Sequence, residues 1–403
     1  MGRFLEKLEF VRPADILSGF VMIGSIPYAL YLKKKRKNMW LICEERDEAR
    51  DNGYWLYKYI CQAHPEQDVV YAINKNSVDY KNVKELGGEV IQYGSYKHWA
   101  YYLAASINIS SQKGGKPNAA VCYLLEVYGI LKNTRAFLQH GVIENDLPFL
   151  HYENTKMSLF ITSAPREHEF IETTFGYPKG SVKCTGIARF DGLHDMKVRK
   201  NRILVMPTWR KWISMPSSVS ASLDDMSAFE TTEYYQRWME LLKDEEVEQW
   251  LEEADMEIVF YPHRNMQKFV SHFKMHGERV KIADWEHYGV QELLKDSAFL
   301  ITDYSSIFND FAYMRKPMIY YQFDYEKFRR GQYGKGYFSF DEDGFGPVCY
   351  DFASLKQELK KAIDRNLENP QVYLEREKAF FPIWDTDNCK RNYEAIKKLQ
   401  EKK

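Results

Sequence analysis

The chain has 403 residues, with 56 Lys and Arg against 57 Asp and Glu, so its formal net charge is −1. This balance argues against a protein whose main task is electrostatic binding of nucleic acid. Hydrophobic residues make up 45% and charged residues 28%, which is too apolar for a disordered chain, and the length predicts two domains or three. The six cysteines have no C-x-x-C spacing, so we expect reduced residues of a cytosolic protein rather than a zinc or redox site.

The first distinctive segment runs from Ile16 to Leu32, which carries no charge and is followed at once by the basic run 33–37. It is at the lower length limit for a membrane span, and Pro27 weakens a straight helix. Basic residues beside apolar surface favour the anionic cytoplasmic leaflet, at about 1 kcal/mol for each basic side chain. We therefore expect residues 1–38 to associate peripherally with that membrane face. A buried helix of the first domain and a true span are the alternatives.

From residue 39 the chain alternates short apolar runs with longer amphipathic stretches. The runs predict buried strands at 39–45, 68–74, 89–94, 119–125, 135–141, 159–164 and 181–186. A helical stretch over 52–63 separates the first two. Strands spaced by helix-length segments are typical of a parallel sheet with crossover helices, so the sequence predicts a Rossmann-like domain over 39–192.

A polar stretch at 191–202 is the best linker candidate, and a second alternating series follows it. Its predicted strands lie at 202–208, 256–262, 279–284, 298–306 and 316–322. A Ser-rich stretch at 214–227 is interpreted as a loop and a candidate lid, and the segment from 355 onward as a charged helical tail. The pattern therefore predicts an α/β chain with two facing Rossmann-like domains, the second being 193–403 with its tail, and a ligand between them.

His140 lies at the end of the predicted strand 135–141. Ligands of open parallel sheets bind at the carboxyl ends of the strands, and the following Gly141 permits a tight turn. Imidazole titrates near neutral pH, so His140 could take a proton from an attacking hydroxyl. At this point a histidine that is only part of the core is an equal alternative.

Three further strand ends carry candidate phosphate ligands. His263 and Arg264 follow an apolar run, and side chains of these types can bind a diphosphate. Asp303 with Ser305 and Ser306 precedes an amphipathic stretch, so these residues either bind an anion or simply cap a helix. The third strand end is 206–211, whose hydroxyl and cations could reach the interdomain cleft.

Several of these segments together resemble the CDP-glycerol glycerophosphotransferase family, which includes the primases and polymerases of bacterial teichoic acid. They are HGV (140–142), GIARFDGL (186–193), MPTWR (206–210), YPHR (261–264) and ITDYSSIFNDFAYMRKPMIYY (301–321). The opening WLICEERDEARDNGYWLYKYI (40–60) is similar to the N-terminal part of the same family. The resemblance covers residues 39–388, and the stretch centred on DYSS is its most specific part.

The resemblance implies a GT-B-like arrangement, with the acceptor side in 39–192 and the donor nucleotide in 193–403. It also implies transfer of glycerol phosphate from CDP-glycerol with release of CMP. His140 is then the base that deprotonates the acceptor hydroxyl, and His263 is the second essential histidine, beside the donor diphosphate. The other implied donor-binding residues are Asp303, Ser305 and Ser306, with Arg264, Thr208 and Arg210 as auxiliary phosphate contacts.

The expected partners follow from that reaction. They are a CDP-glycerol donor, a lipid-linked saccharide or polyol-phosphate acceptor and an anionic membrane surface, but no nucleic acid; a homo-oligomer is left open. No metal cage is evident, so we expect no metal and no cofactor, with cationic side chains in place of Mg²⁺. At 403 residues the chain has little room for the extra N-terminal domain of long polymerases, which favours a compact, primase-like or capsule-locus member.

Three rival functions remain open at this stage. The donor could be CDP-ribitol, because ribitol-phosphate enzymes resemble this family too. The chain could instead be a GT-B glycosyltransferase that uses a nucleotide sugar. The non-catalytic alternative is a membrane scaffold that keeps a vestigial nucleotide cleft.

Overall fold

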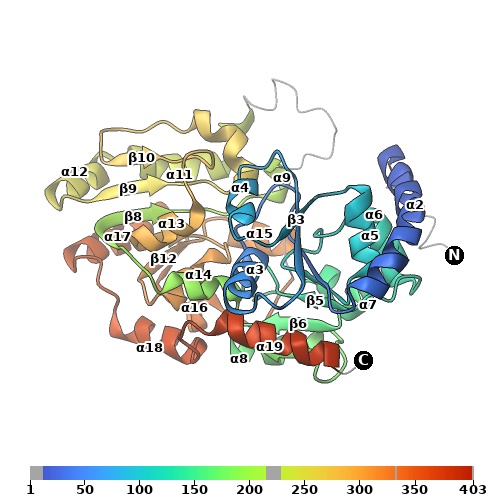
Figure 1. The fold of residues 1–403 in the computed structure, drawn as a ribbon. Helices are drawn as coiled ribbons and strands as arrows, with labels where there is room; N and C mark the ends of the chain where they lie inside the picture. The colour runs from blue at the N-terminus through green and yellow to red at the C-terminus, as the bar shows by residue number, and fades with distance from the viewer. Residues whose placement is uncertain (1–11, 215–227, 332–333, 402–403) are drawn as a thin grey trace. The chain divides into compact units, whose positions relative to one another are not determined.

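The computed structural model describes residues 12–214, 228–331 and 334–401, so the candidate lid lies outside the described residues apart from Ser214. The chain divides into two units, each with its own parallel sheet (Figure 1). Unit 1 is formed by Met1–Val142, Leu147–Gly192 and Asp385–Lys403, and unit 2 by Ile143–Asp146 and Leu193–Trp384.

Unit 1 contains a seven-stranded sheet in the order β3-β2-β1-β4-β5-β6-β7. Every pairing between its neighbouring strands is parallel. In chain order the strands are β1 (Trp40–Cys43), β2 (Val69–Ile73), β3 (Glu89–Gln92), β4 (Ile107–Ser110), β5 (Arg135–Phe137), β6 (Leu159–Thr162) and β7 (Val182–Cys184). All residues of β1, β2, β4 and β6 are buried, as expected for a parallel sheet covered on both faces.

The helices of unit 1 connect these strands. They are α2 (Pro13–Lys35), α3 (Asn52–Ala63), α4 (Tyr80–Lys84), α5 (Tyr96–Ala104), α6 (Ala119–Val127), α7 (Tyr152–Thr155), α8 (Pro165–Thr174) and α19 (Asn388–Glu401), with 3-10 turns η1 (Pro148–Leu150) and η2 (Ala188–Leu193). The bounds of α3 match the predicted helix at 52–63.

One predicted strand of unit 1 is wrong. Residues 119–125 form helix α6, and the fourth strand is instead β4, which the apolar pattern did not reveal. A short apolar run does not distinguish a strand from a buried helix. Asn118 decides between them, because its side chain accepts a hydrogen bond from the Val121 backbone amide at 2.9 Å and so caps a helix.

Helix α2 is continuous through Pro27 and ends in a last turn containing Lys33, Lys34 and Lys35. It lies beside α5, as Figure 1 shows, and is held there by a hydrogen bond from Trp99 Nε1 to Ser18 Oγ at 3.0 Å. Among the described residues it is the one helix whose length and composition would allow it to cross a membrane. Only 17% of its most apolar window is buried.

Unit 2 contains a six-stranded sheet in the order β10-β9-β8-β11-β12-β13, again with parallel pairings throughout. In chain order the strands are β8 (Arg199–Val205), β9 (Glu257–Phe260), β10 (Val280–Ile282), β11 (Ser297–Thr302), β12 (Met318–Tyr321) and β13 (Val348–Cys349). All five strands predicted for this half are present, and β8 begins inside the expected linker. The strand order reverses between β8 and β11, where ligands bind in Rossmann-like sheets.

The helices of unit 2 lie between and after these strands. They are α9 (Lys211–Ser214), α11 (Glu233–Lys243), α12 (Glu245–Glu253), α13 (Val290–Asp296), α14 (Ile307–Tyr313), α15 (Tyr325–Gly331), α16 (Phe340–Asp343), α17 (Phe352–Asp364) and α18 (Gln371–Phe380), with the 3-10 segment η3 (Arg264–His272).

The C-terminal tail is helical, as expected, but its last helix belongs to unit 1 rather than to the domain 193–403. Helix α19 packs against α3, and Cys389, Tyr393 and Ile396 join the core of unit 1. Asp191 fixes the start of this helix by accepting hydrogen bonds from the Asn388 and Cys389 amides. All six cysteines of the chain are free thiols.

Candidate active site

His140 follows β5 in a loop whose backbone is strained. Gln139 has φ of 49°, a left-handed conformation that is uncommon for a residue other than glycine. Two buried hydrogen bonds stabilise it: Asn52 Nδ2 donates to Gln139 O at 2.7 Å, and Gln139 Nε2 donates to Glu167 Oε1 at 2.9 Å. Strain of this kind persists only where surrounding contacts impose it, which is typical of functional sites.

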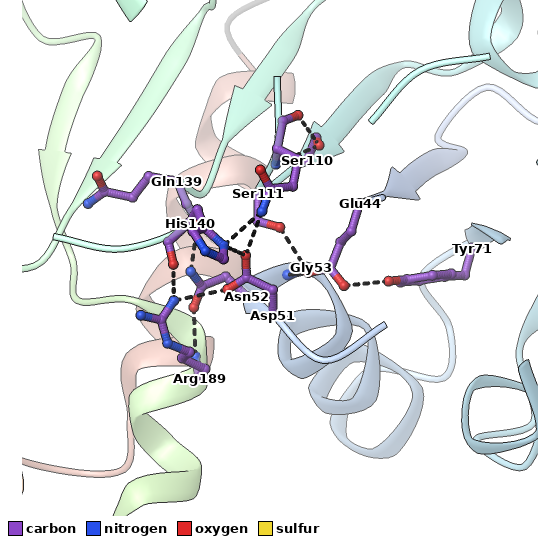
Figure 2. Close-up of polar contacts among 11 residues, drawn as sticks. Glu44, Asp51, Asn52, Gly53, Tyr71, Ser110, Ser111, Gln139, His140 and Arg189 are labelled. Atoms are coloured by element: carbon purple, nitrogen blue, oxygen red, sulfur yellow. Dashed lines mark hydrogen bonds and ion pairs between the residues drawn. The ribbon is translucent and has the colours of Figure 1, made fainter. Parts of the chain in front are cut away.

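The imidazole of His140 contacts a carboxylate from the start of α3 (Figure 2). His140 Nδ1 lies 2.6 Å from Asp51 Oδ2, and the other oxygen of Asp51 accepts a hydrogen bond from Arg189 Nη1 at 2.9 Å. Arg189 also donates to the backbone carbonyl of His140. Asp51, His140 and Arg189 therefore form one connected charged group, contributed by three segments that are distant in sequence.

Asp51 is ionised in this arrangement. Burial alone would raise the pKa of its carboxyl, but the charge and hydrogen bond of His140, together with the charge of Arg189, lower the pKa below its ordinary value. An ionised carboxylate beside an imidazole stabilises the protonated ring that a general base must become.

A second carboxylate, Glu44, lies deeper at the end of β1 (Figure 2). It accepts hydrogen bonds from the Gly53 amide at 2.6 Å, the Tyr71 hydroxyl at 2.7 Å and the Ser111 hydroxyl at 2.9 Å. Burial and the charge of Asp51 raise the pKa of Glu44 to about 7. Of the two carboxylates, only Asp51 is therefore fully ionised at neutral pH.

The strand ends of unit 2 hold a different group. The Thr208 amide donates to Asp303 Oδ1 at 2.8 Å, which ties the ends of β8 and β11 together. Arg210 pairs with Asp303 Oδ2 at 2.9 Å and with Asp324 Oδ2 at 2.7 Å. The side chains of Arg210 and Asp303 are both 0% exposed. Arg210 is expected from the resemblance as an auxiliary phosphate contact and Asp303 as part of the donor-binding helix start; in this structure both residues are buried and hold the two strand ends.

The two serines after Asp303 stand at the start of α14. Ser306 is the residue before the helix, yet its side chain makes no capping hydrogen bond. Ser305 is mostly buried, and its carbonyl accepts a hydrogen bond from the Phe308 amide at 3.1 Å. The sequence left helix capping open as the role of these residues, but the Ser306 hydroxyl does not cap α14.

His263 and Arg264 follow β9 as expected. His263 Nδ1 accepts a hydrogen bond from the Asn265 amide at 3.1 Å, so a neutral His263 ring carries its proton on Nε2. The guanidinium of Arg264 stacks over the Trp285 ring, 5.2 Å from its centroid. His263 is thus a hydrogen-bond donor through Nε2, suited to a phosphate oxygen rather than to proton abstraction.

The sequence pattern had singled out His140 but not the residues that contact it. Asp51 and Arg189 lie in the stretches 40–60 and 186–193, which carry the family resemblance, so their position in those stretches was the available signal. Within 12–214, 228–331 and 334–401, no group of three or more His, Cys, Asp or Glu side chains could hold a metal ion.

Two parallel sheets with Rossmann strand order and polar residues at their carboxyl ends define a GT-B-like α/β protein. A wall teichoic acid polymerase, TagF, has a similar fold: the TM-score is 0.67 at 16% identity, covering 99% of this chain and 97% of that one. A UDP-N-acetylglucosamine 2-epimerase from Listeria monocytogenes is also similar, with a TM-score of 0.54 at 13% identity over 91% of this chain and 97% of that one. The expected fold class is confirmed.

The chain belongs to the CDP-glycerol:poly(glycerophosphate) glycerophosphotransferase family, whose sequence profile matches residues 26–398. It is 30% identical over 378 residues to the minor teichoic acid biosynthesis protein GgaB of Bacillus subtilis (strain 168), covering 91% of this chain. It is also 31% identical over 114 residues, 28% of the chain, to a teichoic acid glycerol-phosphate transferase of Staphylococcus aureus. The chain spans 40% of the length of GgaB, and that second match covers 27% of the transferase.

Proposed function

We propose that the chain transfers glycerol phosphate from CDP-glycerol to a hydroxyl group of a lipid-linked saccharide or polyol-phosphate polymer and releases CMP. The product would be a teichoic acid or a similar cell-surface polymer. The observation that carries the proposal is the family match over residues 26–398. Similarity to the TagF fold supports it, since TagF structures include soaks described as containing CDPG.

The proposed step is a single displacement at the β-phosphorus. The acceptor oxygen forms a bond to that phosphorus while the bond from the phosphorus to the bridging oxygen breaks, and CMP leaves with that oxygen. The acceptor proton moves to His140, whose contact with ionised Asp51 favours the protonated ring. Little covalent chemistry is left to the protein in a phosphoryl transfer, so positioning and charge stabilisation supply most of the acceleration.

Unit 2 supplies the donor contacts in this proposal. His263 donates through Nε2 to a diphosphate oxygen, and Arg264 and the hydroxyls of Ser305 and Ser306 are further contacts. The Ser306 side chain makes no capping bond to α14, which supports a ligand role for its hydroxyl. Thr208, Arg210 and Asp303 act indirectly, by fixing the strand ends behind these groups.

The test is nucleotide release from purified protein offered CDP-glycerol, CDP-ribitol or a UDP-sugar, each with a lipid-linked disaccharide acceptor. The first two donors would release CMP and the third would release UDP. We expect acceptor-dependent CMP from CDP-glycerol, with the acceptor gaining the mass of one glycerol phosphate. A mass gain of ribitol phosphate, or of a sugar, would move the proposal to the corresponding rival donor.

Two variants complete that test. His140→Ala should lower turnover by about 10²- to 10⁴-fold, the usual contribution of a general base. His263→Ala should also lower it, because a charge-assisted hydrogen bond to the diphosphate is lost. If neither variant loses turnover while wild type is active, the site assignment is wrong. If cells retain normal polymer with both variants, the scaffold alternative holds.

We further propose that α2 docks the enzyme on the cytoplasmic membrane face. Its exposed apolar residues include Leu17, Phe20 and Ile23, and each would gain about 1.5–3 kcal/mol from burial in a membrane. The lysines of its last turn suit an anionic surface. Phe20→Ser with Ile23→Ser should abolish flotation with phosphatidylglycerol vesicles. Val372→Ser, which removes an exposed apolar residue of α18, should leave flotation intact, and unchanged flotation of the double variant would refute the docking proposal.

A further inference from the structure

We propose that Asp51 is the positioning residue for His140: it fixes the proton of the neutral imidazole on Nδ1, so that Nε2 is the nitrogen that takes the acceptor's proton. The inference rests on the proposed function, in which His140 is the base. It adds a residue and a proton location to that function.

The first support is the competition for Nδ1. Asp51 Oδ2 lies 2.6 Å from Nδ1, and Gln112 Nε2 lies 2.7 Å from the same atom. A carboxylate can only accept a hydrogen bond, whereas an amide nitrogen can only donate one. Because the ionised carboxylate is the stronger partner, Nδ1 carries the proton and donates to Asp51. Gln112 Nε2 then donates to Asp51 Oδ2, from which it lies 3.4 Å.

The second support is that the Asp51 side chain does not cap helix α3. It is the residue before α3, but its side chain makes no capping hydrogen bond to the helix. Asp244 and Asp351 occupy the same position at α12 and α17, and both cap, accepting from the Val247 and Ser354 amides at 2.8 Å. Asp79 before α4 also makes no capping bond and accepts a hydrogen bond from Arg50 instead, so an aspartate at this position that does not cap is engaged by another side chain, as Asp51 is by His140 and Arg189.

Glu44 caps the start of α3 in place of Asp51. It accepts the hydrogen bond of the Gly53 amide, in the first turn of α3, at 2.6 Å. A Cβ atom at Gly53 would lie 2.7 Å from Glu44 Cγ, so a side chain at this residue would displace Glu44. The start of α3 is thus capped from the end of β1, and the Asp51 carboxylate is held toward His140 by Arg189 Nη1 at 2.9 Å.

Asn52, the next residue, fixes the backbone of the same loop. Its side chain donates to Gln139 O at 2.7 Å and accepts from the Arg189 amide at 2.9 Å. Residues 51 and 52 therefore hold both the ring of His140 and the peptide that precedes it. The dipeptide Asp51–Asn52 thus contacts His140 and the loop around it in several places, as a positioning role requires.

The test compares three variants in the CMP-release assay. In Asp51→Asn the shape is kept, but Gln112 Nε2 now donates to Nδ1, so the proton moves to Nε2 and the ring cannot accept another there. We expect turnover to fall by about 10²- to 10⁴-fold with little change in the KM for CDP-glycerol. In Asp51→Asn with Gln112→Glu, a carboxylate returns within reach of Nδ1, and at least a tenfold recovery is expected.

The control is Asp79→Asn. Asp79 is a buried carboxylate that accepts hydrogen bonds from Arg50 Nε at 2.9 Å and the Ala49 amide at 3.1 Å. Both donors belong to the segment just before Asp51. Its loss perturbs the segment without touching His140, so turnover should stay within about threefold of wild type. Equal losses in Asp51→Asn and Asp79→Asn, without recovery in the double variant, would reduce Asp51 to a structural residue and overturn the proposal.

A second readout does not depend on turnover. Nitrogen NMR of ¹⁵N-histidine-labelled protein distinguishes the two imidazole tautomers, and the His140 signal is the one lost in His140→Ala. Wild type should carry the proton on Nδ1 and Asp51→Asn on Nε2. Nε2 protonation in neutral wild type would refute the positioning role even if the enzyme is active. Conversely, an Nδ1 proton in protein that is inactive with every donor would keep the positioning role and refute the proposed function.

Discussion

The charged groups at the strand ends of the two units are arranged differently. In unit 1 the Asp51 carboxylate is 14% exposed and contacts a histidine ring that is 67% exposed. In unit 2 the charges of Arg210, Asp303 and Asp324 are between 0% and 4% exposed and pair with one another. In unit 1 the carboxylate of Asp51 thus contacts the titratable ring of His140. In unit 2 the paired charges hold the backbone ends of β8 and β11 together. The difference teaches that a charged residue at a strand end can have a structural role, because its charge can be paired with other buried charges, as that of Arg210 is.

The largest effect should come from breaking the buried group of unit 2. Arg210→Met leaves Asp303 and Asp324 as two unpaired buried carboxylates, so we expect a loss of about 3–5 kcal/mol in the free energy of unfolding. Urea denaturation measures it. Arg264→Met, which removes an exposed arginine stacked on Trp285, should cost less than about 1 kcal/mol. Equal stabilities of the two variants would show that Arg210 is not a structural residue.

A smaller effect is expected in unit 1 from Asn52→Ala. The change leaves the Gln139 carbonyl and the Arg189 amide without their partner, at a cost of about 1–3 kcal/mol in unfolding free energy. Asn201→Ala is the control, because its amide donates to the Asp255 carbonyl at an exposed position and should cost less than about 0.5 kcal/mol. The prediction fails if thermal denaturation gives Asn52→Ala the stability of the control.

A pH-dependent effect concerns Glu44, whose pKa is raised from 4.5 to about 7 by burial and the charge of Asp51. Between these values the folded protein binds more protons than the unfolded chain, so this residue makes stability fall as pH rises from about 4.5 to 7. Glu44→Gln cannot titrate, so the difference in stability between wild type and variant should change steadily across that range. A constant difference from pH 4.5 to 7, measured by urea denaturation, would contradict the raised pKa.

The sequence predicted most of the framework because hydrophobic runs and their spacing are local signals. Of the thirteen strands in the described part of the chain, eleven lie on predicted runs. The exceptions are β13, which is only Val348–Cys349, and β4, in place of which the pattern predicts a strand at 119–125. In β4 the apolar residues Ile107 and Ile109 alternate with Asn108 and Ser110, which are buried polar residues, so the strand has no apolar run.

The site was predicted less completely than the fold. The sequence predicts His140 and His263 as site residues because both follow strands. It does not single out Asp51, because an aspartate before a helix has an ordinary local explanation as a cap. The burial of Arg210 is not predicted from the sequence, because its partner Asp324 lies 114 residues away, a pairing that no local pattern reveals. Which charged residues are enclosed depends on such distant contacts.

The most direct test of the proposed separate roles of the two units is the affinity for CDP-glycerol. It is measured by isothermal titration calorimetry without acceptor on wild type, His140→Ala and His263→Ala. If unit 1 supplies the base and unit 2 the donor contacts, His140→Ala should bind the donor as wild type does while having lost turnover. His263→Ala should bind it about 10- to 100-fold more weakly, the equivalent of one charge-assisted hydrogen bond. Weakened binding in His140→Ala with unchanged binding in His263→Ala would contradict the account.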